Sequence, residues 1–125
     1  MSTTIKADIK KAYDAIAPKY LTWTQSTHAI RLLYLDKLLQ NLNTAPPPPP
    51  ESPSHADDPP KRNMLELGCG AGVPVTQHLT TLPNTSITAN DISETQIALA
   101  RERLPPSVTL IQGDMMELTF PDATF

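Results

Sequence analysis

The chain has 125 residues and a formal charge of −3, with 10 lysine and arginine residues against 13 aspartate and glutamate residues. This length limits it to one ordinary domain. Its single cysteine, Cys69, excludes an internal disulfide and a zinc site built from several cysteines, which suits a reducing compartment. No run of about 18 apolar residues is present, and the N-terminal segment has no apolar core, so we expect a cytoplasmic protein without membrane span or signal peptide.

The charge is spread unevenly along the chain. Residues 1–45 carry six basic and three acidic side chains, whereas residues 63–125 carry two basic and seven acidic ones. An acidic C-terminal half repels a phosphate backbone, so we expect a small-molecule ligand and no nucleic acid partner. The histidines, His28, His55 and His78, are scattered without metal-ligand spacing, and no metal site is expected.

Two amphipathic helices are predicted in residues 1–44. The first runs from Thr4 to about Ala17, where apolar side chains recur at helical spacing and Pro18 ends the helix. The second begins near Ser26 and carries a broad apolar stripe that we expect to be buried. That stripe consists of Ile30, Leu33, Tyr34, Leu35, Leu38, Leu39 and Leu42.

Residues 45–62 are predicted to be a linker or a surface insertion. Eight of the 14 prolines fall between positions 46 and 60, and five of these are consecutive. Proline excludes regular helix and sheet here and favours extended polyproline II. The run contains a PxxP pattern, so a ligand for an SH3 or WW domain is a less favoured alternative.

The C-terminal segment, residues 63–125, alternates between predicted strands and helices. In chain order these elements are strand Met64–Leu67, helix Val73–Leu82, strand Ser86–Asn90, helix Ser93–Leu104 and strand Val108–Gln112. Ser93 and Gln96 match a capping box at the start of the second of these helices. Strands separated by helices of this length form a parallel sheet, so we expect a Rossmann-like α/β unit.

Three of the four glycines, Gly68, Gly70 and Gly72, lie between the first predicted strand and its helix. Glycine permits positive φ and lets a ligand approach the backbone, and the following helix presents free N–H groups. We therefore expect a cradle for a small ligand. The dinucleotide fingerprint G-x-G-x-x-G would need glycine where Val73 stands, and a P-loop would need a lysine that is absent. A nicotinamide-binding enzyme stays open as an alternative.

Three motifs in order carry a resemblance to a known family. The run Glu66-Leu67-Gly68-Cys69-Gly70-Ala71-Gly72, then Asn90-Asp91, then Gly113-Asp114-Met115 resembles the class I S-adenosylmethionine-dependent methyltransferases. The N-terminal AYDAIAPKY is similar to the helix that precedes this core in many small-molecule methyltransferases. The resemblance covers nearly all of the chain outside the proline-rich stretch. It implies S-adenosyl-L-methionine as cofactor, methyl transfer to a small-molecule acceptor, and strands 1 to 3 of the family's core after two N-terminal helices.

By this resemblance, the glycine loop lies under the methionine portion of the cofactor. Gly68, Cys69 and Gly70 would contact that portion, and Glu66 would support the loop or face the ammonium group. Because a buried unpaired charge is costly, Glu66, which lies between apolar neighbours, needs a partner. Cys69 is expected as a small loop residue and not as a nucleophile, since nothing in the sequence indicates a lowered pKa.

The resemblance assigns the other half of the cofactor to two aspartates. Asp91 would hold the ribose hydroxyls, since a carboxylate there can accept two charge-assisted hydrogen bonds, while Ser93 is the better N-cap of the next helix. Asp114 and the backbone of Met115 would read the adenine amino edge, with a plain turn as the alternative for Asp114. The expected cofactor-binding set is completed by Gly72, Ile92 and Tyr20. Three aromatic residues of the N-terminal segment, Tyr13, Tyr20 and Trp23, either cover the pocket or pack the helix against the sheet.

No catalytic base can be named from the sequence. In similar enzymes the acceptor wall and any base come from the fourth strand onward, and this chain stops at Phe125, where that strand is expected. We therefore expect the chain to be the N-terminal part of a methyltransferase. The alternative is a non-catalytic, cofactor-binding partner subunit that docks the exposed edge of its sheet on another protein.

Overall fold

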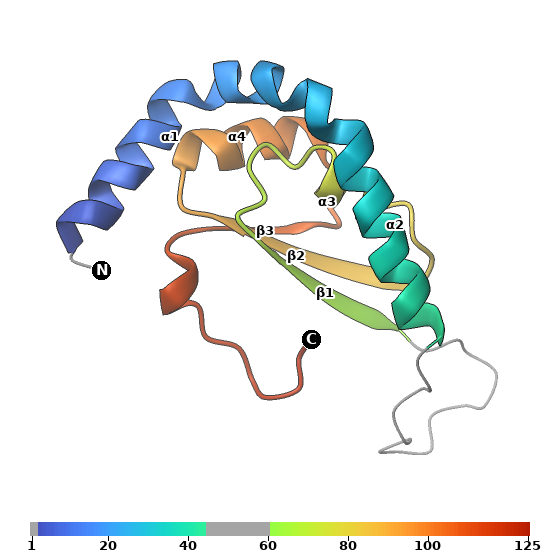
Figure 1. The fold of residues 1–125 in the computed structure, drawn as a ribbon. Helices are drawn as coiled ribbons and strands as arrows, with labels where there is room; N and C mark the ends of the chain where they lie inside the picture. The colour runs from blue at the N-terminus through green and yellow to red at the C-terminus, as the bar shows by residue number, and fades with distance from the viewer. Residues whose placement is uncertain (1–2, 45–60) are drawn as a thin grey trace.

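The computed structural model describes residues 3–44 and 61–125. The predicted linker, residues 45–62, therefore falls almost entirely outside the described residues. The chain begins with helix α1 (Thr3–Trp23), the short 3₁₀ helix η1 (Thr24–Thr27) and helix α2 (His28–Thr44). These helices form an arch over the rest of the described chain (Figure 1). The prediction of two N-terminal helices is confirmed.

Helix α1 continues past Pro18, so the prediction that it ends near Ala17 is wrong. Proline removes one hydrogen bond and crowds the carbonyl four residues before it, yet the helix continues to Trp23. Beyond it, Thr24 Oγ1 donates to the carbonyl of Tyr20 at 2.9 Å. The continuation keeps Tyr20 in helical register with the residues that precede the proline.

Helix α2 buries less of its apolar stripe than the sequence predicts. Leu39 is buried in the core and Leu35 packs against it half-buried. The exposed members of the stripe are Ile30, Leu33, Tyr34, Leu38 and Leu42. Within the described chain α2 packs mainly along one side, on α3, where His78 Nε2 lies 3.0 Å from Asp36 Oδ1. The apolar stripe is wider than the contact that α2 makes with the described chain, so its outer side chains stay exposed.

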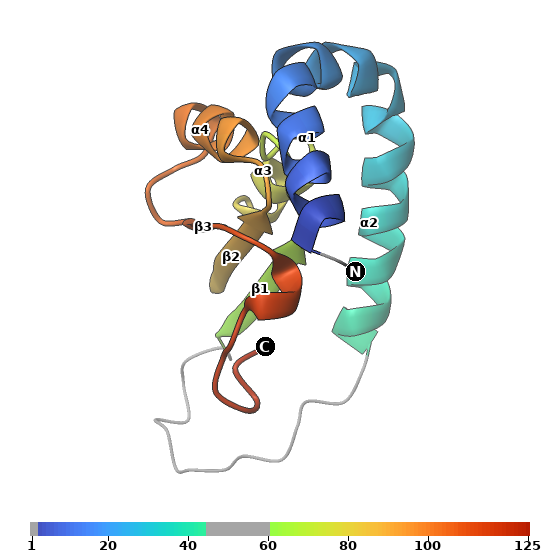
Figure 2. The same cartoon turned by 90° about the vertical axis from the view of Figure 1, so that its left-hand side faces the viewer.

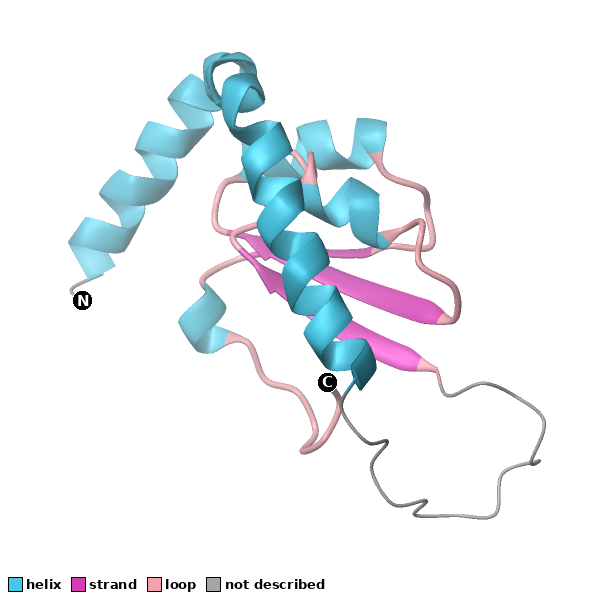
Figure 3. Ribbon diagram, turned by 45° about the vertical axis from the view of Figure 1, so that its right-hand side comes forward, coloured by secondary structure: helices cyan, strands magenta, loops and turns pink. Residues whose placement is uncertain are grey.

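Three parallel strands follow, in the spatial order β1-β2-β3. The elements are β1 (Arg62–Leu67), α3 (Val75–Leu79), β2 (Thr85–Asp91), α4 (Glu94–Arg103), β3 (Thr109–Gln112) and the 3₁₀ helix η2 (Met115–Glu117). Figure 3 shows the strands side by side in magenta, with the helices in cyan. This arrangement is the predicted Rossmann-like parallel sheet, and the alternation of strand and helix predicted it because parallel neighbours need a crossover segment.

The register brings the carboxyl ends of the strands to one edge of the sheet. Leu67 is opposite Asn90, and Asp91 is opposite Gln112. The loops that follow the three strands therefore meet there, which is where open α/β sheets bind ligands. Behind this edge lies a core of Leu39, Cys69, Leu79, Ile87, Ala89, Ile97, Ala100, Leu104 and Val108. No helix in the described part of the chain is long and apolar enough to cross a membrane.

Gly72 joins the glycine loop to this core. It has φ +80°, and a Cβ built on it would lie 2.6 Å from Cδ1 and 2.9 Å from Cγ of Leu104. Leu104 is buried, so its side chain has little room to yield. Gly72 thus allows close packing of the loop on the end of α4, which any side chain would prevent.

We expect Gly72→Ala to lower the free energy of unfolding by about 2–4 kcal/mol, because left-handed strain and overpacking add together. Gly68→Ala is the matched control: Gly68 has φ +70°, but nothing lies within 4 Å of its Cβ position. It should lose only the strain, about 1–2 kcal/mol. Urea unfolding of both variants measures the difference, and equal losses would contradict the steric role of Leu104.

Candidate functional site

A hollow of about 430 Å³ opens at the carboxyl edge of the sheet, under helix α1. We call it the main hollow. Its walls are Lys6, Ile9, Tyr13 and Tyr20 of α1, Gly68 and Gly70, the β2 end with Asn90, Asp91 and Ile92, Gln96 of α4, and Asp114, Met115 and Met116 after β3. A second hollow of about 50 Å³ adjoins it at the glycine loop and is lined by Cys69, Arg31 and others. Four residues, Tyr20, Gly68, Gly70 and Gln96, border both.

The backbone of the glycine loop faces the main hollow without side chains in the way. Gly68 has φ +70° and Gly70 has φ +58°, conformations that L residues rarely adopt. The Cβ position of Gly68 is open space, so a ligand can approach the backbone there. Cys69 N–H donates to the carbonyl of Asn90 at 2.8 Å, which ties the loop to the end of β2.

Asp91 connects this loop to helix α4. Its Oδ2 accepts a hydrogen bond from Gly70 N–H at 2.9 Å, and its Oδ1 accepts one from Ser93 N–H at 2.9 Å. Ser93 is the N-cap of α4, as predicted, and its Oγ accepts from Gln96 N–H at 3.1 Å. A carboxylate oxygen has two acceptor directions, so Asp91 keeps acceptor capacity toward the hollow that it lines.

Asp114 closes the opposite end of the main hollow. Its Oδ1 accepts a hydrogen bond from Met116 N–H at 3.0 Å and caps η2. Its Oδ2 forms an ion pair with Lys6, which brings the first turns of α1 beside η2 (Figure 2). The hydrogen bond from Lys6 lowers the pKa of Asp114, and the same contact raises the pKa of Lys6. This ion pair attaches the N-terminal end of α1 to one side of the hollow.

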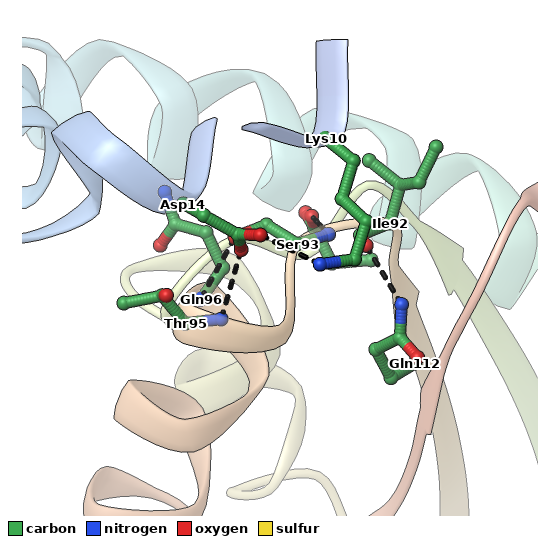
Figure 4. Close-up of polar contacts among 8 residues, drawn as sticks. Lys10, Asp14, Ile92, Ser93, Thr95, Gln96 and Gln112 are labelled. Carbon is green, nitrogen blue, oxygen red and sulfur yellow. Dashed lines mark hydrogen bonds and ion pairs between the residues drawn. The ribbon is translucent and has the colours of Figure 1, made fainter. Parts of the chain in front are cut away.

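The second attachment of α1 is Asp14 (Figure 4). Its Oδ1 accepts hydrogen bonds from Ser93 Oγ at 2.6 Å and Thr95 N–H at 3.1 Å, and its Oδ2 pairs with Lys10 at 2.6 Å. A carboxylate at a helix N-terminus is favoured because free N–H groups and the helix dipole face it. Desolvation by burial raises the pKa of Asp14, but the hydrogen bonds from Lys10, Ser93 and Thr95 outweigh it and hold the pKa at about 2.

Two buried side-chain oxygens at the main hollow have no hydrogen-bond partner. Asn90 is 1% exposed, and its Nδ2 donates to the carbonyls of Ile111 and Gly113 at 3.1 and 2.9 Å. Its Oδ1 accepts nothing, and neither does Oε1 of Gln96, which is also 1% exposed. Buried polar atoms without partners are rare and costly in native proteins. Two of them at one hollow indicate a ligand that carries hydrogen-bond donors.

Glu66 and Cys69 support the loop from behind. Thr76 Oγ1 donates to Glu66 Oε2 at 2.5 Å, so Glu66 has the partner that the sequence required, while burial raises its pKa. Burial also raises the pKa of Cys69 to about 12, with further contributions from the charges of Glu66 and Asp91. Such a thiol is protonated and unreactive at neutral pH.

The structure brings together most of the residues that the sequence predicted for the site. Those that line the main hollow are Gly68, Gly70, Asp91, Ile92, Asp114, Met115 and Tyr20. Cys69 lines the second hollow, whereas Glu66 and Gly72 line neither. Sequence reasoning missed Lys6, Ile9, Gln96 and Met116 as wall residues. The spacing of Lys6, Ile9 and Tyr13 on one helix face was the signal that could have found the first two.

A family model described as a methyltransferase domain matches residues 64–125. This segment forms the sheet and most of the wall of the main hollow. Through these residues the chain belongs to the class I methyltransferases. Membership of this family implies S-adenosylmethionine as the methyl donor. Within residues 3–44 and 61–125, no group of three or more His, Cys, Asp or Glu side chains is placed to hold a metal ion.

Methyltransferases of three kinds are similar to the chain. It is 39% identical over 59 residues to the malonyl-(acyl-carrier protein) O-methyltransferase of Neorickettsia risticii, covering 47% of this chain and 24% of that protein. It is 36% identical over 73 residues to the release factor glutamine methyltransferase of Rhodopirellula baltica, covering 54% and 25%. It is 31% identical over 71 residues to a sterol 24-C-methyltransferase of Gibberella zeae, covering 53% and 18%. The matches thus span a quarter or less of each relative.

We expect Asp14→Ala to lower the free energy of unfolding at pH 7 by about 1–2 kcal/mol, the usual loss for a removed N-terminal cap. Because the native pKa of about 2 lies below the ordinary 3.8, the carboxylate stabilises the fold above about pH 4. That contribution disappears as the pH falls through 2, so the two proteins should converge in acid. Urea unfolding across pH measures this, with Asp8→Ala on the exposed side of α1 as control. A difference that persists below pH 2 would contradict the assignment.

We expect the thiol of Cys69 to resist alkylation in the folded chain, because its raised pKa and burial leave almost no accessible thiolate. Iodoacetamide at neutral pH should label it at a small fraction of the rate in guanidinium-unfolded protein. Mass spectrometry over time measures both rates. Comparable rates would show that the loop opens far more readily than its packing indicates.

Proposed function

We propose that this chain binds S-adenosylmethionine in the main hollow and contributes the cofactor-binding part of a methyltransferase. The observation that carries the proposal is the pair of unpartnered buried oxygens, Asn90 Oδ1 and Gln96 Oε1, beside a glycine loop whose backbone is open to a ligand. S-adenosylmethionine carries an amine, two hydroxyls and an ammonium group. These donors suit a hollow lined by acceptors and carboxylates.

Different residues of the hollow would contact different parts of the cofactor. Asp91 would accept hydrogen bonds from the ribose hydroxyls while it keeps its bonds to Gly70 and Ser93. Asp114 and the backbone of Met115 would meet the adenine edge, where Lys6 now pairs with the carboxylate. Gly68, Gly70 and Cys69 would pass under the methionine portion, with Glu66 and Gly72 holding the loop from behind and Ile92 and Tyr20 packing on the ligand.

The bound cofactor supplies a methyl group that is activated by its sulfonium. The chain's own task is to bind and orient, an effect that reaches about 7–11 kcal/mol in well-oriented intramolecular reactions. Helix α1 covers the hollow and is held there by the contacts of Lys6 and Asp14. None of the described residues is assigned as a catalytic base.

The acceptor that we propose is a small molecule. The acidic C-terminal half disfavours nucleic acid, and α1 covers the hollow at close range. In this scheme residues 1–44 form the cover, residues 45–62 a linker and residues 63–125 the cofactor-binding part. A cytoplasmic location suits the single unpaired cysteine. The three relatives are named for an acyl-carrier protein, a release factor glutamine and a sterol, so their names favour no single class of acceptor.

Isothermal calorimetry with S-adenosylmethionine and NAD in parallel tests the cofactor. We expect heat with S-adenosylmethionine and none with NAD. Asp91→Asn should weaken binding about tenfold or more, because it removes the charge from the bonds to the ribose and sets an NH2 group against the N–H of Gly70 or Ser93. Asp122→Asn, on the exposed C-terminal turn, is the matched control and should change nothing. Heat with NAD alone would overturn the proposal.

The acceptor class is tested with methyl-labelled S-adenosylmethionine in an extract of the source cells. A labelled small product that chromatography separates from S-adenosylmethionine, and that forms only when the chain is added, supports a small-molecule acceptor, whereas label in protein or lipid contradicts it. Cofactor binding with transfer only after a second protein is added would favour the partner-subunit alternative. That alternative is supported by β1, which lies at an edge of the described sheet.

A further inference from the structure

Gln96 is a buried residue at the main hollow for which the sequence predicted only a role in capping α4. It lies in the first turn of α4, is 1% exposed and borders both hollows. In a capping box its side chain would accept a hydrogen bond from the N–H of the N-cap, Ser93. The structure gives that N–H to Asp91 Oδ1 instead, at 2.9 Å. Half of the predicted capping box is therefore missing.

The side-chain oxygen of Gln96 is left without a partner by this exchange. It lies against the glycine loop, 3.8 Å from the position that a Cβ on Gly70 would occupy. A buried acceptor in a native protein is satisfied by protein, water or ligand. Gln96 lines both hollows beside Gly70, so its buried free oxygen lies in the wall of the space that a ligand would occupy.

The surroundings favour a cationic donor. The charges of Glu66 and Asp91 both act on the neighbouring Cys69, where they help to raise the pKa of the thiol. Arg31, a cation that lines the second hollow, acts on Glu66. Asn90, Asp91 and Asp114 line only the main hollow, while Gln96 lies where the two hollows meet at the glycine loop. Among the donors of S-adenosylmethionine, the ribose hydroxyls and the adenine amine have acceptors at those two aspartates. The ammonium group is the donor that remains.

We infer that the side-chain oxygen of Gln96 accepts a hydrogen bond from the ammonium group of the amino-acid end of the cofactor. The inference rests on the proposed function and adds a specificity residue to it. Asp91 accepts the hydrogen bond of Ser93 N–H in place of Gln96, and this leaves the Gln96 oxygen free for the amino-acid end of the cofactor. The bond is made only with a ligand that carries this group.

The test compares two probes that share the nucleoside and differ in the amino-acid end. S-adenosylhomocysteine carries the ammonium group, and 5′-methylthioadenosine lacks the whole amino-acid end. Gln96→Met has similar length and removes the acceptor, so we expect about tenfold or more loss of affinity for S-adenosylhomocysteine and less than twofold for 5′-methylthioadenosine. Gln96→Glu keeps the acceptor and should retain or tighten binding of S-adenosylhomocysteine.

The matched control is Gln77→Met, the same change on the exposed side of α3, which should leave both affinities unchanged. Without ligand, Gln96→Met should unfold at or above the wild-type temperature, because it removes an unsatisfied buried oxygen. Equal losses for both probes, or none, would overturn the inference while wild-type binding upholds the proposed function. Failure of the wild-type chain to bind either probe would overturn both.

Discussion

The Asp91 carboxylate is the contact on which the site depends. One oxygen holds Gly70 in the glycine loop, and the other holds Ser93 at the start of α4. Ser93 in turn donates to Asp14, so a single chain of hydrogen bonds links the sheet edge, the loop, α4 and the covering helix α1. Because each link satisfies a buried polar group, the loss of one leaves its neighbour unpaired.

This network explains how α1, a largely exposed helix, can form a wall of the main hollow. Most apolar side chains of α2 are exposed, and α1 has one buried residue, Ala17. Apolar burial alone therefore holds α1 and α2 only weakly against the rest of the described chain. Its position over the main hollow comes from the ion pair of Lys6 and the cap made by Asp14, contacts whose strength depends on charge and on pH. A cover held this way is attached to both ends of the hollow.

Local signals located the strands and helices, although α3 (Val75–Leu79) is shorter than the predicted helix Val73–Leu82. The strand and helix pattern predicted the parallel sheet, and the clustered glycines predicted the cradle at its edge. The same kind of reasoning predicted that α1 ends near Pro18 and that the whole apolar stripe of α2 is buried, and both predictions were wrong. Hydrophobic spacing shows neither whether a helix continues past a proline nor how wide its packing contact is. Only one of the two hydrogen bonds of the predicted capping box forms at Ser93. The Ser93 N–H donates to Asp91 and not to Gln96, and residue spacing does not show which of these two acceptors is preferred.

By itself the sequence determined the family, the parallel order and the residue types of the site, since these follow from periodicity, from glycine and from short motifs. Only the tertiary structure decided which of these side chains meet. It joined Lys6 to Asp114 and Asp14 to Ser93 across more than 75 positions, and it left Gln96 with a free acceptor. Such pairings depend on how α1 packs over the sheet edge, and packing between distant segments leaves no local periodicity in the sequence.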